Sequence, residues 1–174
     1  IYDNGTVDVD ASFVTGKDFR LPRLALQTFL NPSLKWLTWY GRGPQENYRD
    51  RRNSAFMGVF SSDVYDMKED YVRAQSMGER TDAKWIVFKD DNGKGIKITA
   101  PEGIDFSALH YTDKDLWTVK YGHDTDDVLR REIVLNLDCI QRGIGNASCG
   151  PQPRPEYEIA SEAEYTFSFR IEPL

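Results

Sequence analysis

Hydrophobic and polar residues alternate along much of the chain, and a period of two predicts β-strands. The clearest example is the last segment, where Tyr165, Phe167, Phe169 and Ile171 alternate with polar residues. One face of that strand should be buried and the other should face water. Residues 133–137, which read Ile-Val-Leu-Asn-Leu, predict another central strand.

Residues 85–88 and the segment after them predict a hairpin. Residues 85–88 are apolar at every position, as expected for a strand packed between layers. Residues 91–93 read Asp-Asn-Gly and predict a turn, beyond which Ile96 and Ile98 alternate with polar residues. These features place two antiparallel strands in the middle of the chain.

Other local signals are shorter. An earlier strand is predicted with leucines on one side and polar residues on the other: Leu24, Leu26 and Leu30 against Arg23 and Gln27. Residues 157–159 predict a strand after a Pro-rich surface loop at 151–155. Residues 112–117 predict a short helix capped by Thr112, and residues 46–52 predict one helical turn.

Many short strands separated by turns predict an all-β, antiparallel β-sandwich that occupies residues 1–174 as a single domain. A chain of this length buries roughly 70% of the surface that its unfolded form exposes, so it can build its own core. No internal repeat, low-complexity tract or linker divides it.

The formal net charge is −6. An acidic surface repels phosphate backbones, so the composition argues against a nucleic-acid partner. No apolar run in the sequence approaches the ~20 residues that cross a bilayer, so no membrane partner is indicated. No signal peptide opens the chain, which leaves its location unknown.

The two cysteines, Cys139 and Cys149, are too few for a disulfide-stapled scaffold. A bridge across the Gly-rich turn between them is conceivable, but free thiols are the favoured interpretation. The sequence has no Cys-x-x-Cys and no cluster of His and Cys, so it gives no support for a zinc site.

The most distinctive stretch is residues 39–52. Two aromatic residues, expected at the end of a strand, are followed by Gly41, Gly43 and Pro44, which predict a turn. Residues 43–51 read Gly-Pro-Gln-Glu-Asn-Tyr-Arg-Asp-Arg. They resemble the Gly-Pro-x-Glu-Asn-Tyr-x-Asp-Arg motif of the C-terminal small-chain domain (domain 5) of β-galactosidases, which are family-2 glycoside hydrolases.

The resemblance extends along the chain. Residues 21–26, Leu-Pro-Arg-Leu-Ala-Leu, are similar to a Leu-Pro-Arg-x-Gly-Leu strand of that domain, with Ala25 in place of glycine. Residues 71–82 are similar to its Tyr-x-x-Pro-Gln-Glu-x-Gly-x-Arg-x-Asp pattern, with departures at Ala74 and Ser76. Each motif is weak alone, but their order and spacing from residue 21 to about 151 make the match specific.

This resemblance implies a supersandwich, a galactose-mutarotase-like antiparallel β-sandwich. It also implies a C-terminal domain that packs against the catalytic barrel and other domains of a β-galactosidase and closes one wall of the sugar pocket. The family's catalytic glutamates lie in the barrel, so the chain alone should be inactive. It should need no cofactor, because any Mg or Na ions of the parent enzyme would lie in other domains. A bacterial protein, cytoplasmic or periplasmic, is implied.

One contact with substrate is implied, through the loop of residues 146–151. In related enzymes the loop carries a tryptophan that stacks on the glucose or aglycone moiety. Here the loop is one residue shorter and Cys149 stands at that position. Asn146, Ser148 and Cys149 are therefore expected at the rim of the galactoside pocket. A thiol lacks the flat face of an indole, and a buried turn cysteine is the simpler interpretation.

The motif itself is expected to be structural. Glu46 should form an ion pair with one or more of Arg49, Arg51 and Arg52, and arginine neighbours would lower its pKa. That direction is wrong for a general acid, so no catalytic residue is assigned. The side chains of Asn47 and Asp50 are expected to bind backbone groups of the loop, as Asx residues often do.

Two other functions remain open from the sequence. A free-standing carbohydrate-binding module would need an exposed aromatic platform, for which Trp36, Trp39 and Trp117 are candidates; Trp85 is assigned to the core. An aldose-epimerase-like enzyme would need His110 and a carboxylate in one cleft, although a shared fold does not carry function.

Overall fold

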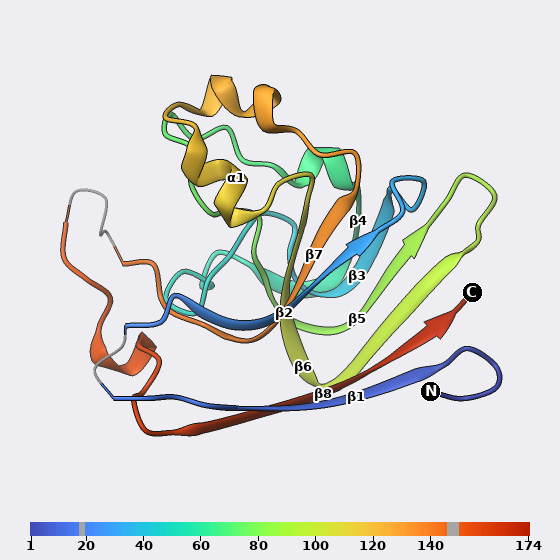
Figure 1. Ribbon diagram of the computed structural model, residues 1–174, viewed down its shortest axis with the longest axis horizontal. Helices are drawn as coiled ribbons and strands as arrows, with labels where there is room; N and C mark the ends of the chain where they lie inside the picture. The colour runs from blue at the N-terminus through green and yellow to red at the C-terminus, as the bar shows by residue number, and fades with distance from the viewer. Residues whose placement is uncertain (18–19, 146–149) are drawn as a thin grey trace.

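The computed structural model describes residues 1–17, 20–145 and 150–174. Within these ranges the chain forms antiparallel strands joined by short helices and loops (Figure 1). The strands are β1 Val7–Val14, β2 Arg23–Leu30, β3 Trp36–Gly43, β4 Phe56–Asp63, β5 Arg80–Lys89, β6 Gly95–Leu109, β7 Ile133–Gln141 and β8 Glu164–Pro173. The helices are α1 Asp113–Thr118 and the 3-10 turns η1 Val64–Met67, η2 Gly122–Val128 and η3 Pro155–Tyr157.

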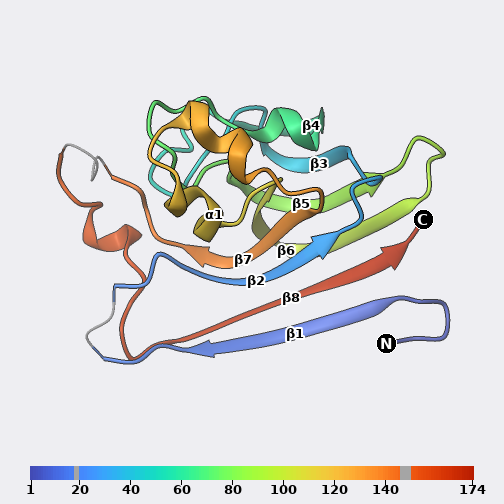
Figure 2. The same cartoon turned by 45° about the horizontal axis from the view of Figure 1, so that its top comes forward.

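One long strand, β6, organises the sheet. The main strand order is β1-β8-β6-β5-β3-β4, and β7 branches from β6 to pair with β2. The first part of β6, residues 96–99, pairs with β8, whereas residues 105–109 pair with β7. The sheet therefore splits into two wings along β6, and α1, η1 and η2 gather on one side of it (Figure 2). The result is the all-β, open sandwich-like architecture that the sequence predicted.

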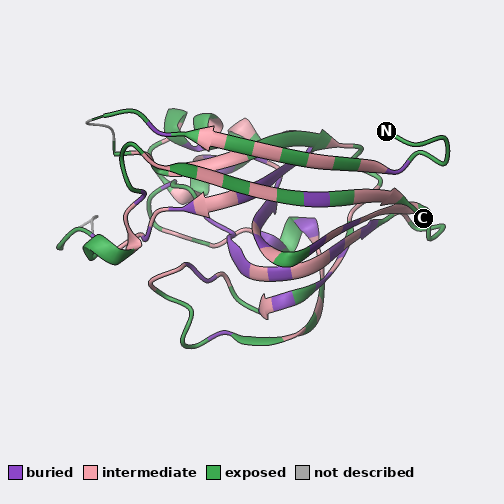
Figure 3. Cartoon of the chain, turned by 90° about the horizontal axis from the view of Figure 1, so that it is seen from below, coloured by how far each residue is buried: buried purple, intermediate pink, exposed green. Residues whose placement is uncertain are grey.

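The predicted alternation is confirmed in the last strand. Phe169 is buried and Tyr165, Phe167 and Ile171 are half-buried, while the polar residues that alternate with them up to Arg170 are exposed. The paired strand β1 alternates in the same way, and the banding of exposed and covered positions along these long strands is visible in Figure 3. Both strands therefore place one face on the core.

The core is lined by central strands. The first six residues of β7 are buried on both faces, so the predicted central strand at residues 133–137 is confirmed. The β5–β6 hairpin is confirmed too, with its turn at residues 90–94. Residues 85–88 differ from expectation. Ile86 and Phe88 are fully buried, but Trp85 and Val87 are only half-buried, because no described segment fully covers one face of β5.

The helical predictions are confirmed at one place and wrong at another. Thr112 caps α1 through a capping box with Asp115, as predicted. Residues 46–52 form an irregular loop with one turn bond, from the Arg51 N–H to the Tyr48 carbonyl, and no helical turn. The strand predicted at 157–159 is also absent, because Pro155 begins the 3-10 turn η3.

The strand before the motif is longer than predicted. β3 continues through Gly41 to Gly43 before the chain turns at Pro44. Gly41 lies within the strand, and its lack of a side chain lets β5 approach closely. A Cβ at this position would lie 2.8 Å from the Ala83 Cα. The glycine that suggested a turn thus allows close packing of two strands.

Candidate functional site

The loop after β3 is joined to the segment that follows β7. The two carboxylate oxygens of Asp50 accept backbone N–H groups of Ile144 (3.1 Å) and Gly145 (2.7 Å). The neighbouring Arg51 donates from Nη2 to the Gly145 carbonyl oxygen at 2.6 Å. Gly143 makes this approach possible, since a Cβ there would lie 2.9 Å from the Asp50 carboxylate. We call residues 142–145 the loop stem.

The returning chain closes the stem from the other side. The Gly143 N–H donates to the Tyr157 carbonyl oxygen at 2.8 Å. Arg142 donates from Nη2 to Gln152 and to Glu158, each at 2.8 Å. Both ends of the loop are therefore held by hydrogen bonds.

The residues expected to face the sugar lie between these two ends. Asn146, Ser148 and Cys149 fall outside the described residues. The structure therefore describes the stem that carries them, and their roles stay predictions. Of the two cysteines, Cys139 carries a free thiol whose pKa is raised by burial.

Glu46 does not pair with an arginine among the described residues, contrary to the expected ion pair. Its carboxylate accepts hydrogen bonds from the hydroxyls of Tyr71 and Tyr48 and from the Gly78 N–H, the latter at 2.9 Å. Burial raises the pKa of Glu46, which corrects the lowering expected from nearby arginines. The reason is geometric, because the irregular loop directs Arg52 toward Asp82, with an Nη1–Oδ2 distance of 3.2 Å.

Asn47 occupies the centre of the motif and is fully buried. Its Oδ1 accepts the N–H (3.1 Å) and the hydroxyl (2.5 Å) of Thr81, while its Nδ2 donates to the Gln45 carbonyl at 3.1 Å. Its own N–H donates to the Glu79 carbonyl at 2.8 Å. The side chain of Asn47 therefore fastens the loop to the start of β5.

A charged network lies beneath the motif. The Arg23 guanidinium binds both oxygens of Asp138, at 2.7 and 3.0 Å, and Oε2 of Glu79 at 3.0 Å. Burial raises the pKa of Asp138 to about 7 and that of Glu79 well above its usual range. Both carboxylates are about 1% exposed, so no sugar reaches them. This network serves the fold.

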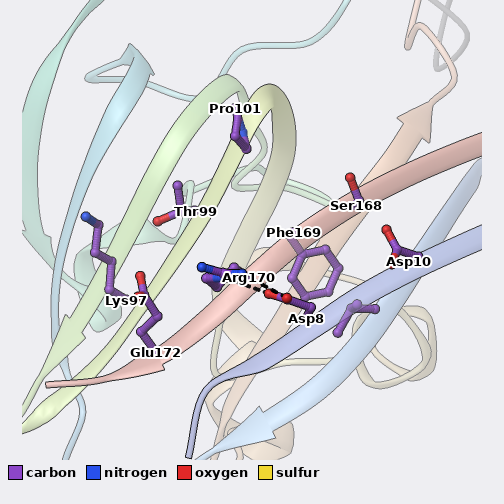
Figure 4. A pocket seen from close by; sticks show the side chains of 10 residues that line it. Asp8, Asp10, Lys97, Thr99, Pro101, Ser168, Phe169, Arg170 and Glu172 are labelled. Carbon is purple, nitrogen blue, oxygen red and sulfur yellow. Dashed lines mark hydrogen bonds and ion pairs between the residues drawn. The ribbon is translucent and has the colours of Figure 1, made fainter. Parts of the chain in front are cut away.

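A groove of about 450 Å³ opens between β1, β6 and β8 (Figure 4). Arg170 crosses it and binds Asp8 with two hydrogen bonds of 2.6 and 2.9 Å. The hydrogen bonds from Arg170 lower the pKa of Asp8 to about 2. Asp8 therefore stays ionised at neutral pH and is unsuited to donate a proton to a leaving group.

Of the residues proposed for the alternative functions, Trp39 is buried and His110 contacts the backbone. Trp39 is 1% exposed, whereas Trp36 (47%) and Trp117 (87%) are exposed on separate elements, β3 and α1. Trp117 and Trp36 therefore share no platform with Trp39. The Nδ1 atom of His110 lies 3.1 Å from the Glu132 carbonyl oxygen, a backbone contact.

Among residues 1–17, 20–145 and 150–174, no group of three or more His, Cys, Asp or Glu side chains is placed to hold a metal ion. None of the helices in these ranges has the length and apolar character required to cross a membrane. The site is instead organised by hydrogen bonds between the motif loop and the loop stem.

Comparison with known proteins agrees with the motif. The family described as "Beta galactosidase small chain" matches residues 1–171. A "Beta-galactosidase" of Priestia megaterium is 27% identical over 176 residues, covering 100% of this chain and 17% of that protein. Similar proteins of the same name occur in Halalkalibacterium halodurans (29% over 177 residues) and Kluyveromyces lactis (28% over 162 residues). The two matched regions cover 98% and 86% of this chain, but 17% and 14% of the respective relative. The chain thus spans about one sixth of the length of the curated relatives it matches.

Proposed function

The chain belongs to the β-galactosidase small chain family, and we propose that it acts as a non-catalytic domain of an enzyme that hydrolyses terminal β-D-galactosides. In this proposal it packs against the catalytic barrel and other domains of its parent and forms one wall of the sugar pocket. The observation that carries the proposal is the hydrogen-bonded stem at Ile144 and Gly145, directly before the loop that the family resemblance places at the sugar.

The stem gives this role a physical basis. A loop that contacts substrate is effective only when its ends are fixed, because ordering a mobile segment on binding opposes affinity. Asp50 and Arg51 supply three hydrogen bonds to the stem, two of them to a carboxylate, and such charge-assisted bonds are the stronger kind. The conspicuous motif would therefore act at a distance from the sugar, by positioning the loop.

The loop itself would shape the pocket more than it binds. We place Asn146 and Ser148 at the rim, where their polar side chains suit sugar hydroxyls, and Cys149 beside the galactoside or its aglycone. A thiol offers no flat apolar ring, so stacking would contribute little binding free energy. The loop would then exclude water and limit the space for the aglycone.

The chemistry would reside elsewhere in the parent. A retaining glycosidase needs two carboxyl groups about 5–5.5 Å apart, one of which must carry a proton. The paired, ionised Asp8 and the inaccessible Glu79 and Asp138 do not suit that chemistry. Mg and Na ions, if the parent uses them, would lie in its other domains.

The test is hydrolysis of a nitrophenyl β-galactoside by two purified proteins. The parent polypeptide that contains this chain should turn the substrate over, and the 174-residue chain alone should match the buffer rate. A folded parent without activity toward galactosides would contradict the proposed function. Turnover by the chain alone, abolished by one Asp or Glu substitution, would contradict the non-catalytic role.

A further inference from the structure

The two edges of the main sheet have different surfaces. Among the described residues, β1 and β4 end the strand path and each pairs with a single neighbour. β1 carries Asp8 and Asp10 at alternate positions, which is a common protection of a true edge. β4 begins Phe-Met-Gly-Val-Phe and carries no charged side chain before Asp63. A run that is apolar at every position is typical of a strand buried on both faces and paired on both sides.

Both faces of β4 are nevertheless exposed. Phe56, on the side of the core ring Phe60, is 64% exposed, and its ring centroid lies 5.5 Å from that of Phe60. Val59 and Met57, on the opposite face, are 62% and 39% exposed. Aromatic packing thus continues from the core to the edge strand β4, where Phe56 is exposed to solvent.

The apolar surface continues from β4 across the neighbouring strands. Tyr40 of β3 is in register with Val59 of β4 and with Trp85 of β5, so these three side chains share one face. Tyr40 is 38% exposed and lies against the half-buried Trp85, with ring centroids 6.3 Å apart. We call Tyr40, Met57, Val59, Trp85 and Val87 the outer patch. It lies where the sequence predicted a second layer over residues 85–88.

We propose that a β-strand or sheet from the parent polypeptide, outside these 174 residues, pairs with β4 and covers the outer patch. This inference rests on the proposed function, because it requires a longer parent. The relatives supply its scale, since in the Priestia megaterium protein the matched region is 17% of the length, which leaves most of the chain available for such contacts.

A second copy of the chain fits the surface less well. Two copies that pair through β4 would form one continuous sheet, and edge-to-edge pairing satisfies backbone groups without covering a face. Val59, Tyr40 and Trp85 would still face water. A layer from the parent can satisfy the free edge and bury the outer patch together.

Hydrogen exchange in two proteins tests the proposal. In the chain alone, the β4 amides should exchange faster than those of the central strand β5, because one side of β4 has no partner. In the parent polypeptide the β4 amides should exchange at least about tenfold more slowly than in the chain alone. The amides of β8, which is paired with β1 and β6, are the internal control and should change little.

A pair of variants adds a second readout. Val59→Lys should lower the melting temperature of the parent while leaving that of the isolated chain within about a degree, since its side chain is exposed only in the chain. Val14→Lys is the matched control. Val14 is 80% exposed on the opposite edge strand, and its replacement should alter neither protein.

The outcomes separate the proposals. Unprotected β4 amides in an active parent would overturn this inference and leave the proposed function intact. Protected β4 amides in a parent that does not hydrolyse galactosides would support this inference and contradict the proposed function. The isolated chain could instead form a dimer that dissociates in the Val59→Lys variant, while the β4 amides gain no protection in a monomeric parent. That result would identify a second copy as the occupant and overturn the inference.

Discussion

Asp50 accepts the backbone N–H of Gly145 at 2.7 Å, across 95 residues of sequence. The contact joins the most conspicuous motif of the chain to the stem of the loop that the family resemblance places at the sugar. Both partners suit this contact, because a carboxylate can accept two neighbouring N–H groups at once and Gly143 leaves room for it. The motif loop is therefore a support for a second loop.

The first prediction concerns this support in the isolated chain. Asp50→Ala should remove two charge-assisted hydrogen bonds and free the stem, so the Ile144 and Gly145 amides should exchange faster. The free energy of unfolding should fall by about 1.5–3 kcal/mol. Asp66→Ala, at an exposed aspartate of η1, is the control and should leave both quantities unchanged. Unaltered exchange at Gly145 in Asp50→Ala would contradict the role of the contact.

The second prediction concerns Glu46. Glu46→Ala leaves the Tyr71 hydroxyl and the Gly78 N–H without their acceptor, so the free energy of unfolding should fall by about 1–3 kcal/mol. Double-mutant cycles should give a coupling energy of about 1 kcal/mol between Glu46 and Tyr71, using Tyr71→Phe. The cycle with Arg52→Ala should give a coupling near zero. Strong coupling to Arg52 would indicate an ion pair between Glu46 and Arg52 and would contradict the contacts that the structure shows for Glu46.

The third prediction concerns the buried charges. At about pH 8, above the raised pKa of Asp138, Arg23→Ala leaves that buried carboxylate without its cation, and breaking a buried pair in this way costs about 3–5 kcal/mol. Asp113→Ala removes the most exposed partner of Arg23 and should cost about 1 kcal/mol or less. Urea denaturation measures both. Equal effects of the two variants would show that the network is far more hydrated than its geometry implies.

The fourth prediction is a pH dependence of stability. Burial raises the pKa of Asp105 to about 6 and that of Asp138 to about 7, above the ordinary value near 4. At pH values between the ordinary pKa and these raised pKa values, the two carboxyl groups bind more protons in the folded chain than in the unfolded chain. The free energy of unfolding therefore falls as pH rises from about 4 to 7. The melting temperature should therefore be higher at about pH 5.5 than at about pH 8.

A variant isolates one of these carboxyl groups. Asp105→Asn keeps an oxygen to accept the Asp82 N–H and removes the titration, so its melting temperature should depend less on pH across this range. Asp8 and Asp115 have lowered pKa values because of hydrogen bonds from arginines, and their effects belong below about pH 4. A wild-type melting temperature that rises between these two pH values would contradict the assignment.

The features that sequence predicted are those set by local pattern. Alternation fixed the faces of β8, and an Asp-Asn-Gly turn between apolar runs fixed the β5–β6 hairpin. Thr112 identified the start of α1, because a cap acts on N–H groups within one turn. β4 was not predicted, since the run from Phe56 to Phe60 does not alternate.

The polar contacts were harder to predict because their partners are distant in sequence. Arg23 finds Asp138 across 115 residues, and Glu46 finds Tyr71 across 25. Sequence reasoning assigned Glu46 to the arginines next to it, yet an irregular loop points neighbouring side chains in different directions. The sequence signals for Arg23 were its predicted place on the polar side of β2 and its position in the Leu-Pro-Arg motif of residues 21–26.

The central claim is that the motif loop positions a substrate-facing loop in a β-galactosidase. The most direct test is the steady-state kinetics of the parent enzyme carrying Asp50→Ala, with Asp66→Ala as the matched control. Asp50→Ala should lower kcat/KM for a nitrophenyl β-galactoside by about tenfold, with the melting temperature of the catalytic barrel unchanged, because freeing the stem misplaces the pocket wall. Unchanged kcat/KM in a variant whose Gly145 amide exchanges freely would contradict the claim.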